Sequence, residues 1–209
     1  MIKAIFFDMG GVLLPLDLPR CIEAYRTVAG FKDVDEYIDP CHQRGFFDEL
    51  EGGNISFEEF MEECKRHCKP GIDIPTLLWC HRQFFEPPTR ETVELVHELA
   101  QKYDLFVLSN NNPVSMSILY PLFQGAGLPF ETSFKKLFLS HEMRVQKPGP
   151  EIFSRAIAES GYAPEEILFI DDSPSNIEGA VPFGIRAALY VPGTPLRGLI
   201  EKNIIFDQK

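Results

Sequence analysis

Short apolar runs recur along the chain and constrain its fold more than any other feature of the sequence. Segments with helical spacing separate them. The runs cover residues 2–8, 104–108, 136–140, 167–171 and 185–190. Runs this short, without polar alternation, are typical of parallel strands buried on both faces. Strands that alternate with helices predict an α/β fold with a doubly wound, mainly parallel, Rossmann-like sheet.

The segment from residue 17 to residue 88 breaks this alternation, because it offers several helical patterns in succession and no strand. The stretch SFEE is a capping box and predicts the start of one of these helices. Prolines lie at both ends of the segment, which is typical of breaks between structural units. We therefore predict two domains: a Rossmann-like core at residues 1–16 and 89–209, and an inserted all-helical cap at residues 17–88.

The charge and hydropathy of the chain narrow its range of partners. A formal net charge of −11, spread along the sequence, argues against binding to nucleic acid and favours solubility. No stretch approaches the roughly 18 apolar residues of a membrane span, so we expect no membrane partner. The start MIKAIFFD places an acid inside its apolar run, unlike a signal peptide, and predicts a cytoplasmic protein. The odd number of cysteines, five, also fits a reducing compartment.

The stretch CKRHC, residues 64–68, raises the question of a zinc site. Its spacing matches no zinc ribbon or finger. Apolar residues instead recur through this region at helical spacing. They are Phe57, Phe60, Met61, Cys64 and Cys68. We therefore predict that these cysteines pack in a core and bind no metal.

Polar side chains stand where several predicted strands end, which is where open α/β sheets bind their ligands. A single aspartate at such a place is more often a turn former or a helix N-cap than a catalyst. Here several chemically suited residues occur together, and this favours a functional site. In chain order they are Asp8, Ser109, Asn110, Lys147, Asp171 and Asp172.

Taken together, these residues resemble the motifs of the haloacid dehalogenase-like hydrolase superfamily, most of whose members are phosphatases. The first motif of those phosphatases is a nucleophilic Asp, any residue, a second Asp and a Gly, and here it reads DMGG. A Ser ending a strand, a Lys before Pro and an acidic pair follow in the family's order. The helical cap after the first strand is also similar. The pattern Asp-x-Gly-Gly resembles the family's branch of small sugar-phosphate phosphatases.

The resemblance implies a Mg²⁺-dependent phosphatase that acts on a small phosphorylated metabolite. Asp8 would be the nucleophile and would pass through an aspartyl-phosphate that water hydrolyses. Asp8, the backbone carbonyl of Gly10, and the pair Asp171 and Asp172 would hold Mg²⁺, with Asp172 as the direct ligand of the pair. Lys147 would hold the phosphate and offset the surrounding carboxylates.

Other polar residues near the motifs receive supporting roles. Ser109 and the Asn110 amide would donate hydrogen bonds to phosphoryl oxygens. Asn111 and Asn112 precede Pro113 and are predicted to cap a helix rather than bind a ligand. Asn176 is expected on the first turn of the next helix, where it would support the acidic loop.

Gly10 departs from the family's pattern, because it stands where the second Asp would protonate the leaving alcohol. General acid–base catalysis contributes about 10²–10⁴ in rate, so its absence needs an explanation. One hypothesis is a phosphatase whose leaving group needs little protonation, or which uses water or a cap residue as the acid. The alternatives are a non-catalytic phosphate-binding or scaffold protein, and a dehalogenase-like hydrolase. The acidic pair disfavours the dehalogenase, since the family's dehalogenases work without metal.

The predicted cap would decide what enters the site. A helical lid hinged near Pro15 and Pro88 would close over the strand ends, exclude water and supply selectivity. Its candidate substrate contacts are His42, Gln43 and Arg44, in the stretch CHQRGFF. Small phosphorylated metabolites would fit under such a lid better than phosphoproteins.

Overall fold

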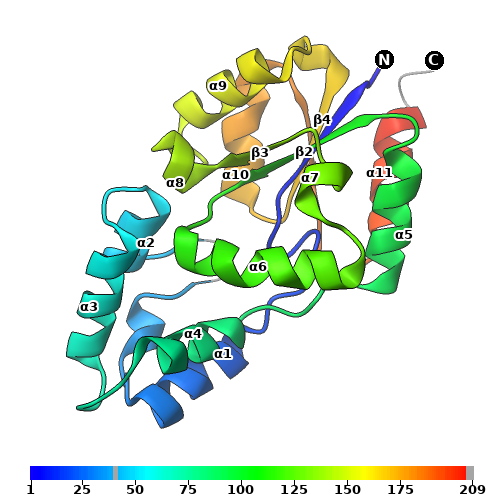
Figure 1. Cartoon of the computed structure of the whole chain (residues 1–209). Helices are drawn as coiled ribbons and strands as arrows, with labels where there is room; N and C mark the ends of the chain where they lie inside the picture. Colours follow the sequence, from blue (N-terminus) through cyan, green and yellow to red (C-terminus); the bar gives the residue numbers. More distant parts are fainter. Residues whose placement is uncertain (40–41, 206–209) are drawn as a thin grey trace.

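The computed structural model describes residues 1–39 and 42–205 of the chain. Its centre is a five-stranded sheet in the order β3-β2-β1-β4-β5, with every neighbouring pair parallel (Figure 1). The strands are β1 (Ala4–Phe7), β2 (Asp104–Ser109), β3 (Lys136–Leu139), β4 (Ile167–Asp171) and β5 (Arg186–Leu189). Each lies within, or within a residue of, a predicted run, so the predicted α/β sheet is confirmed.

Helices cover both faces of the sheet, which explains why the strands are apolar throughout. The side chain of Phe6 packs on one face with helices α9 (Pro150–Ser160) and α10 (Pro174–Ala180). Ile5 and Phe7 point to the other face. The helices on that face are α5 (Arg90–Leu99), α6 (Pro113–Ala126) and α11 (Leu196–Ile205). The expected helix at GPEIFSRAIAESG is α9, with Pro150 in its first turn and Gly161 after its end.

The strand order reverses at the centre of the sheet, because the chain runs from β1 outward to β3 and then returns to β4 beside β1. Crevices at such a reversal, outside the carboxyl ends of the strands, are the usual ligand sites of open α/β sheets. Asp8 directly follows β1, and Asp171 is the last residue of β4. The topology therefore brings together acids that are far apart in the sequence.

Helices follow one another between β1 and α5, and the described residues of this segment contain no strand. The segment holds α1 (Leu18–Ala24), η1 (Tyr25–Ala29), η2 (Val34–Glu36), α2 (Phe46–Glu51), α3 (Phe57–His67) and α4 (Ile74–Arg82). Figure 1 shows them at one end of the molecule, with α6 between α4 and the sheet. We call this group of helices the cap. The predicted capping box opens α3, where the Ser56 side chain accepts a hydrogen bond from the Glu59 backbone.

The predicted apolar stripe on α3 is confirmed at its centre, where Phe60, Met61 and Cys64 are buried. Phe57 and Cys68 at its ends are half-buried. Cys41 lies outside the described residues. The cap's apolar side chains join the core of the α5, α6 and α11 face without interruption. Burial of this kind is the main force that holds such a cap on its partner.

Two backbone segments connect the cap to the core, and they pair with each other. Leu16 and Phe85 form an antiparallel bridge. Beside it, the Asp17 amide donates to the Phe84 carbonyl at 2.8 Å, and the Glu86 amide donates to the Pro15 carbonyl at 3.1 Å. The connection near Pro15 is therefore a paired two-segment link.

Short helices complete the chain. They are α7 (Phe130–Ser133), α8 (Ser140–Met143), η3 (Pro164–Glu166) and η4 (Val181–Phe183). Of these, α8 follows β3 directly and contacts α2 of the cap. Within the described ranges, none of the helices has the length and apolar content that a membrane crossing requires.

Candidate active site

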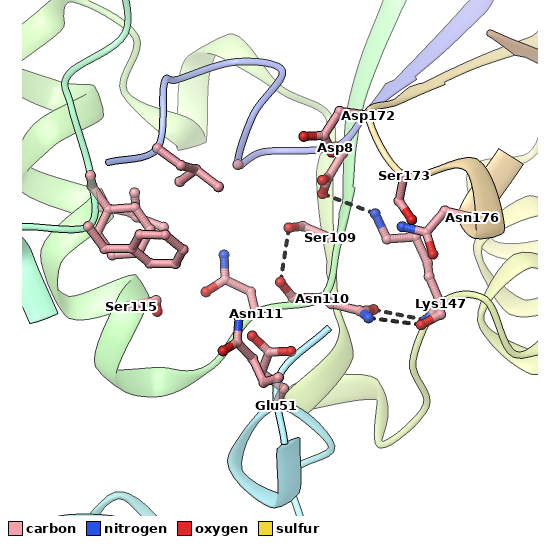
Figure 2. Close-up of a pocket in the computed structure, with 16 residues that line it drawn as sticks. Asp8, Glu51, Ser109, Asn110, Asn111, Ser115, Lys147, Asp172, Ser173 and Asn176 are labelled. Atoms are coloured by element: carbon pink, nitrogen blue, oxygen red, sulfur yellow. Dashed lines mark hydrogen bonds and ion pairs between the residues drawn. The ribbon is translucent and has the colours of Figure 1, made fainter. Parts of the chain in front are cut away.

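A cavity of about 60 Å³ lies at the carboxyl ends of the strands, between the sheet and the cap (Figure 2). Six of the seven residues predicted for the site line it. They are Asp8, Gly10, Ser109, Asn110, Lys147 and Asp172. The seventh, Asp171, is fully buried directly beneath. The fold thus gathers the predicted residues from separate strand ends into one place.

Lys147 occupies the centre of the charged end of this cavity. Its side chain is 1 % exposed, and its Nζ lies 3.0 Å from Asp8 Oδ1 and 2.6 Å from Asp171 Oδ2. The same ammonium donates a third contact, 2.8 Å long, to the Leu108 carbonyl. Two hydrogen bonds, to Asp171 and to the Leu108 carbonyl, and the ion pair with Asp8 therefore fix the position of the ammonium. Lys147 is therefore a buried part of the site and not a solvated surface lysine.

Side-chain hydrogen bonds hold the loop that carries Lys147. The Asn110 Nδ2 donates to the Lys147 carbonyl at 2.9 Å, and the Lys147 amide donates to Asn110 Oδ1 at 2.8 Å. Asn110 therefore uses its side chain to fix the lysine. Among the residues that the structure describes, Ser109 Oγ donates one hydrogen bond, to the Asn110 carbonyl at 3.3 Å, and Ser109 lines the cavity.

Asp171 and Asp172 are neighbours in sequence but differ in their surroundings. Asp171 accepts hydrogen bonds from the Ser173 amide at 2.8 Å, from Asn176 Nδ2 at 3.0 and 3.1 Å, and from Lys147. Asn176 lies in the first turn of α10, as predicted, and supports the acidic loop. Asp172 is half-buried and lines the cavity. Asp172 is therefore the more available ligand of the pair.

The carboxylates of Asp8, Asp171 and Asp172 lie close enough for a single cation, with one oxygen of each within 4.8 Å of the others. Burial, together with the neighbouring carboxylates, raises the pKa of Asp172 to about 7 and raises the pKa of Asp8 above its ordinary value. Burial alone would lower the pKa of Lys147, but Asp171 and Asp8 outweigh it and hold the ammonium charged.

One ammonium therefore faces three acids, and the acids repel one another. A hard divalent cation with oxygen ligands, such as Mg²⁺, fits this donor set and would relieve the repulsion. Across residues 1–39 and 42–205 this is the only cluster of its kind, and the CKRHC stretch forms none.

The glycines after Asp8 leave room for two other side chains. A Cβ on Gly11, whose φ is +75°, would lie 2.0 Å from Asp172 Oδ2, so only glycine allows the acid to sit there. A Cβ on Gly10 would meet Leu16 Cδ1 at 3.2 Å. Leu16 thus fills the space beside Gly10, the position where the resemblance places an acid.

Asn112 and Asn111 play different roles, although both were predicted to cap a helix. Asn112 caps α6 by accepting a hydrogen bond from the Ser115 amide at 2.8 Å. Asn111 does not cap; its Oδ1 accepts from the Asn112 amide, and its side chain lines the cavity. The prediction was wrong for Asn111 because this residue lies two positions before the helix begins, where the chain still lines the cavity.

Residues of the cap and of α6 form the wall opposite the charged end. Most of these residues were not predicted from the sequence. Figure 2 shows Glu51, Asn111 and Ser115 on the far side of Ser109 from Asp172. Apolar side chains complete this wall. They are Leu16, Phe84, Phe85 and Leu119. No local pattern distinguishes these residues from ordinary core residues, or Glu51 from the other acids of its helix.

One of the three predicted cap contacts reaches the cavity. Gln43 lines it, and its Nε2 donates to the Asp39 carbonyl at 2.7 Å. His42 instead places its Nε2 3.0 Å from Ser175 Oγ, and Arg44 is exposed. Neither is among the lining residues, so the prediction for these two was wrong. The chain here is irregular, and a helical reading of the stretch could not show which side chain points inward.

Comparisons with known proteins agree with the geometry of the site. The model of the family described as haloacid dehalogenase-like hydrolase matches residues 2–184. A D-ribitol-5-phosphate phosphatase of Bacteroides thetaiotaomicron is 35% identical over 85% of this chain and 86% of its own length. A phosphorylated carbohydrates phosphatase of Thermotoga maritima is 27% identical over 88% and 82%.

Solved structures resemble the whole chain. A predicted haloacid dehalogenase-like hydrolase of Porphyromonas gingivalis superposes with a TM-score of 0.88 at 33% identity and covers 98% of both chains. A Bacteroides thetaiotaomicron enzyme of the same family, crystallised with magnesium and inorganic phosphate, gives a TM-score of 0.83 at 30% identity. It covers 93% of this chain and 96% of its own.

Proposed function

This chain belongs to the haloacid dehalogenase-like hydrolase family and is a hydrolase of phosphate monoesters, and we propose that its substrate is a small phosphorylated carbohydrate. The observation that carries the proposal is the position of Lys147 between Asp8 and Asp171 at the carboxyl end of the sheet. The names of the two curated relatives support a carbohydrate substrate. The small cavity, lined by both polar and apolar residues, supports a small one.

Each residue of the charged end receives a role in this proposal. Asp8 attacks the phosphorus, the ester P–O bond breaks, and the alcohol leaves with a proton. Water then attacks the phosphorus of the aspartyl-phosphate, which releases phosphate and restores the Asp8 carboxylate. Lys147 keeps Asp8 ionised and offsets the charge of the phosphoryl group. Ser109 and the backbone amide of Asn110 bind phosphoryl oxygens.

Magnesium is the cofactor that this donor set fits. Asp8, the Gly10 carbonyl and Asp172 would hold it, and Asp171 would orient Asp172 and Lys147 from beneath. When bound, the cation neutralises phosphoryl charge and fixes the line of attack. The dehalogenase alternative gives the acidic pair no task, whereas here both acids lie against Asp8.

The opposite wall fits a polyol or sugar. Asn111, Ser115, Gln43 and Glu51 offer amide, hydroxyl and carboxyl groups to substrate hydroxyls, and the phenylalanines provide an apolar surface. The cavity of about 60 Å³ is small beside the few hundred Å³ of ordinary ligand sites, and we propose that the cap moves outward to admit substrate. We place that movement at the paired link between residues 15–17 and 84–86.

A phosphatase screen tests the proposal. The purified protein is assayed on a panel of sugar, polyol and amino-acid phosphates, with Mg²⁺ and with chelator. We expect Mg²⁺-dependent release of phosphate, highest on sugar or polyol phosphates, and a loss of about 10⁴-fold or more in Asp8→Asn. Asp35→Asn, an exposed cap residue, serves as the matched control and should keep full activity. Phosphate release by Asp8→Asn within a few fold of wild type would remove the nucleophile assignment.

A further inference from the structure

Glu51 is a buried acid on the cap side of the cavity. It is the last residue of α2 and is 8 % exposed, yet it lines the same cavity as Asp8. Within the described part of the chain, its carboxyl group has no ion pair and no hydrogen bond. Buried carboxyl groups are rarely left without a partner unless a ligand or a chemical step uses them.

Two contacts hold the end of α2 against the core and so fix where Glu51 lies. The Ser140 hydroxyl donates to the Glu51 carbonyl at 2.7 Å. Gly53, with φ +69°, lets the following turn approach α8 so closely that a Cβ would lie 2.3 Å from the His141 carbonyl oxygen. The carboxyl group is therefore held by its backbone and remains free at its tip.

We propose that Glu51 is the general acid that protonates the leaving-group oxygen, in place of the side chain that Gly10 lacks. The proposal rests on the proposed phosphatase function. Attack by Asp8 expels the leaving oxygen on the side of the phosphorus that faces away from Asp8, so an acid on the cap side of the cavity faces the oxygen that needs a proton. Figure 2 shows Glu51 there, beyond Ser109 and Asn110.

The step balances in protons. As the ester P–O bond breaks, the Glu51 carboxyl gives its proton to the departing alkoxide and becomes a carboxylate. In the second half of the reaction this carboxylate accepts a proton from the attacking water. The P–O bond to Asp8 then breaks, phosphate leaves, and both Asp8 and Glu51 return to their starting states.

Protonation of the free enzyme agrees with this role. Burial, with smaller contributions from Asp48 and Asp8, raises the pKa of Glu51 to about 8, so the side chain carries a proton at neutral pH. A carboxylic acid held neutral in this way can donate. The remaining carboxyl groups of the cavity, Asp8 and Asp172, have their tasks as nucleophile and metal ligand.

His81 is another candidate, because it pairs with the lining residue Ser115, but its geometry excludes it. Its Nε2 pairs with Ser115 Oγ at 2.9 Å and its Nδ1 with the Tyr25 hydroxyl at 3.3 Å, so both ring nitrogens are used. Burial lowers its pKa to about 4, which leaves no spare proton at neutral pH. Ser115 also stands between this ring and the cavity.

The test compares Glu51→Gln with wild type on two esters, the best alkyl phosphate of the panel and 4-nitrophenyl phosphate, at saturating Mg²⁺. We use kcat/KM, which covers the steps up to departure of the alcohol. Glu51→Gln should lose about 10²–10⁴-fold on the alkyl ester and less than about tenfold on the nitrophenyl ester, whose leaving group needs no proton. Glu49→Gln, exposed on the same helix, is the matched control.

Equal losses on both esters would identify Glu51 as a binding or structural residue and overturn the proposal, as would no loss on either. Thermal unfolding checks that the variant is folded. If the variant is unfolded, a series of esters that differ in leaving-group acidity is measured with wild type instead. With an acid in place, kcat/KM should depend only weakly on that acidity. A steep dependence overturns the proposal. Wild type inactive on every phosphate ester would instead refute the proposed function.

Discussion

The two walls of the cavity are built in different ways. On the core wall, the ammonium of Lys147 contacts Asp8, Asp171 and the Leu108 carbonyl, and every contact is 3.0 Å or shorter. On the cap wall, the Glu51 carboxyl has no partner among the described residues, and the phenylalanines present only apolar surface. The core wall is a closed network of charges, whereas the cap wall is held by packing and by its backbone.

This difference separates two demands on the enzyme. Phosphoryl transfer needs charges fixed before substrate arrives, and the strand ends of a rigid sheet supply them. Substrate entry and selectivity need a wall that can move away from the site and return. The cap helices, which pack on the core and are joined to it by the paired link, allow such a movement. Polar links between the cap helices and the core, such as His81 to Ser115 at 2.9 Å and Gln146 to Asp48 at 3.0 Å, involve none of the charged groups around Lys147.

Removal of the central lysine should break the core wall and produce the largest effect. Lys147→Met leaves Asp8 and Asp171 buried without a counter-charge, so we expect the free energy of unfolding to fall by about 3–5 kcal/mol in chelator. Urea titration at neutral pH measures it. Lys136→Met, an exposed lysine paired with Glu159, should cost less than about 1 kcal/mol. A similar small cost for both variants would show that the network does not depend on its ammonium.

The cation site distinguishes the two acids within the core wall. Asp172→Ala removes a direct ligand, and we expect the Mg²⁺ concentration for half-maximal activity to rise by about 100-fold or more. Asn176→Ala disturbs only the support of Asp171 and should raise it by about tenfold. Titration of phosphate release with Mg²⁺ gives both values. A larger effect from Asn176 than from Asp172 would reverse the assignment of the direct ligand.

The two walls also differ in how far the sequence predicts them. The sheet, α9, the capping box of α3 and the charged residues all follow from patterns within short stretches, because strand ends and helix caps are local features. The motif residues converge because parallel strands end at one edge. The cap wall has no such rule: Gln43, Glu51 and Phe85 meet only through the packing of helices far apart in the sequence. For the same reason, His42 and Arg44 were assigned wrongly.

Stability against pH tests whether Glu51 is a protonated acid in the folded cap. Its folded pKa of about 8 lies above the ordinary value of 4.5, so folding takes up a proton between these limits. Wild type should therefore lose stability from this group as pH rises from about 4.5 towards 8. Glu51→Gln cannot titrate, and relative to wild type it should gain about 3 kcal/mol between pH 5 and pH 7.5.

Urea titrations at several pH values in chelator measure this difference. Asp48, Asp8 and Lys147, whose charges act on Glu51, are present in both proteins. The exposed Glu49→Gln variant should run parallel to wild type over the whole range. If Glu51→Gln also runs parallel, Glu51 is ionised in the folded protein and cannot donate a proton at neutral pH.

The smallest effect moves the acid from the cap wall back to the core wall. In the Glu51→Gln background, Gly10→Asp combined with Leu16→Ala supplies a carboxyl group beside Asp8 and removes the side chain that a Cβ would meet at 3.2 Å. We expect kcat/KM on the alkyl ester to recover by about tenfold at saturating Mg²⁺. The nitrophenyl ester should change little, because its leaving group needs no proton. Leu16→Ala with Glu51→Gln, without the new acid, should recover nothing. A gain of equal size on both esters, or a gain in that control, would mean that the room left by Leu16→Ala, and not a missing proton donor, limits the reaction. The two walls would then not share the task of acid catalysis in this way.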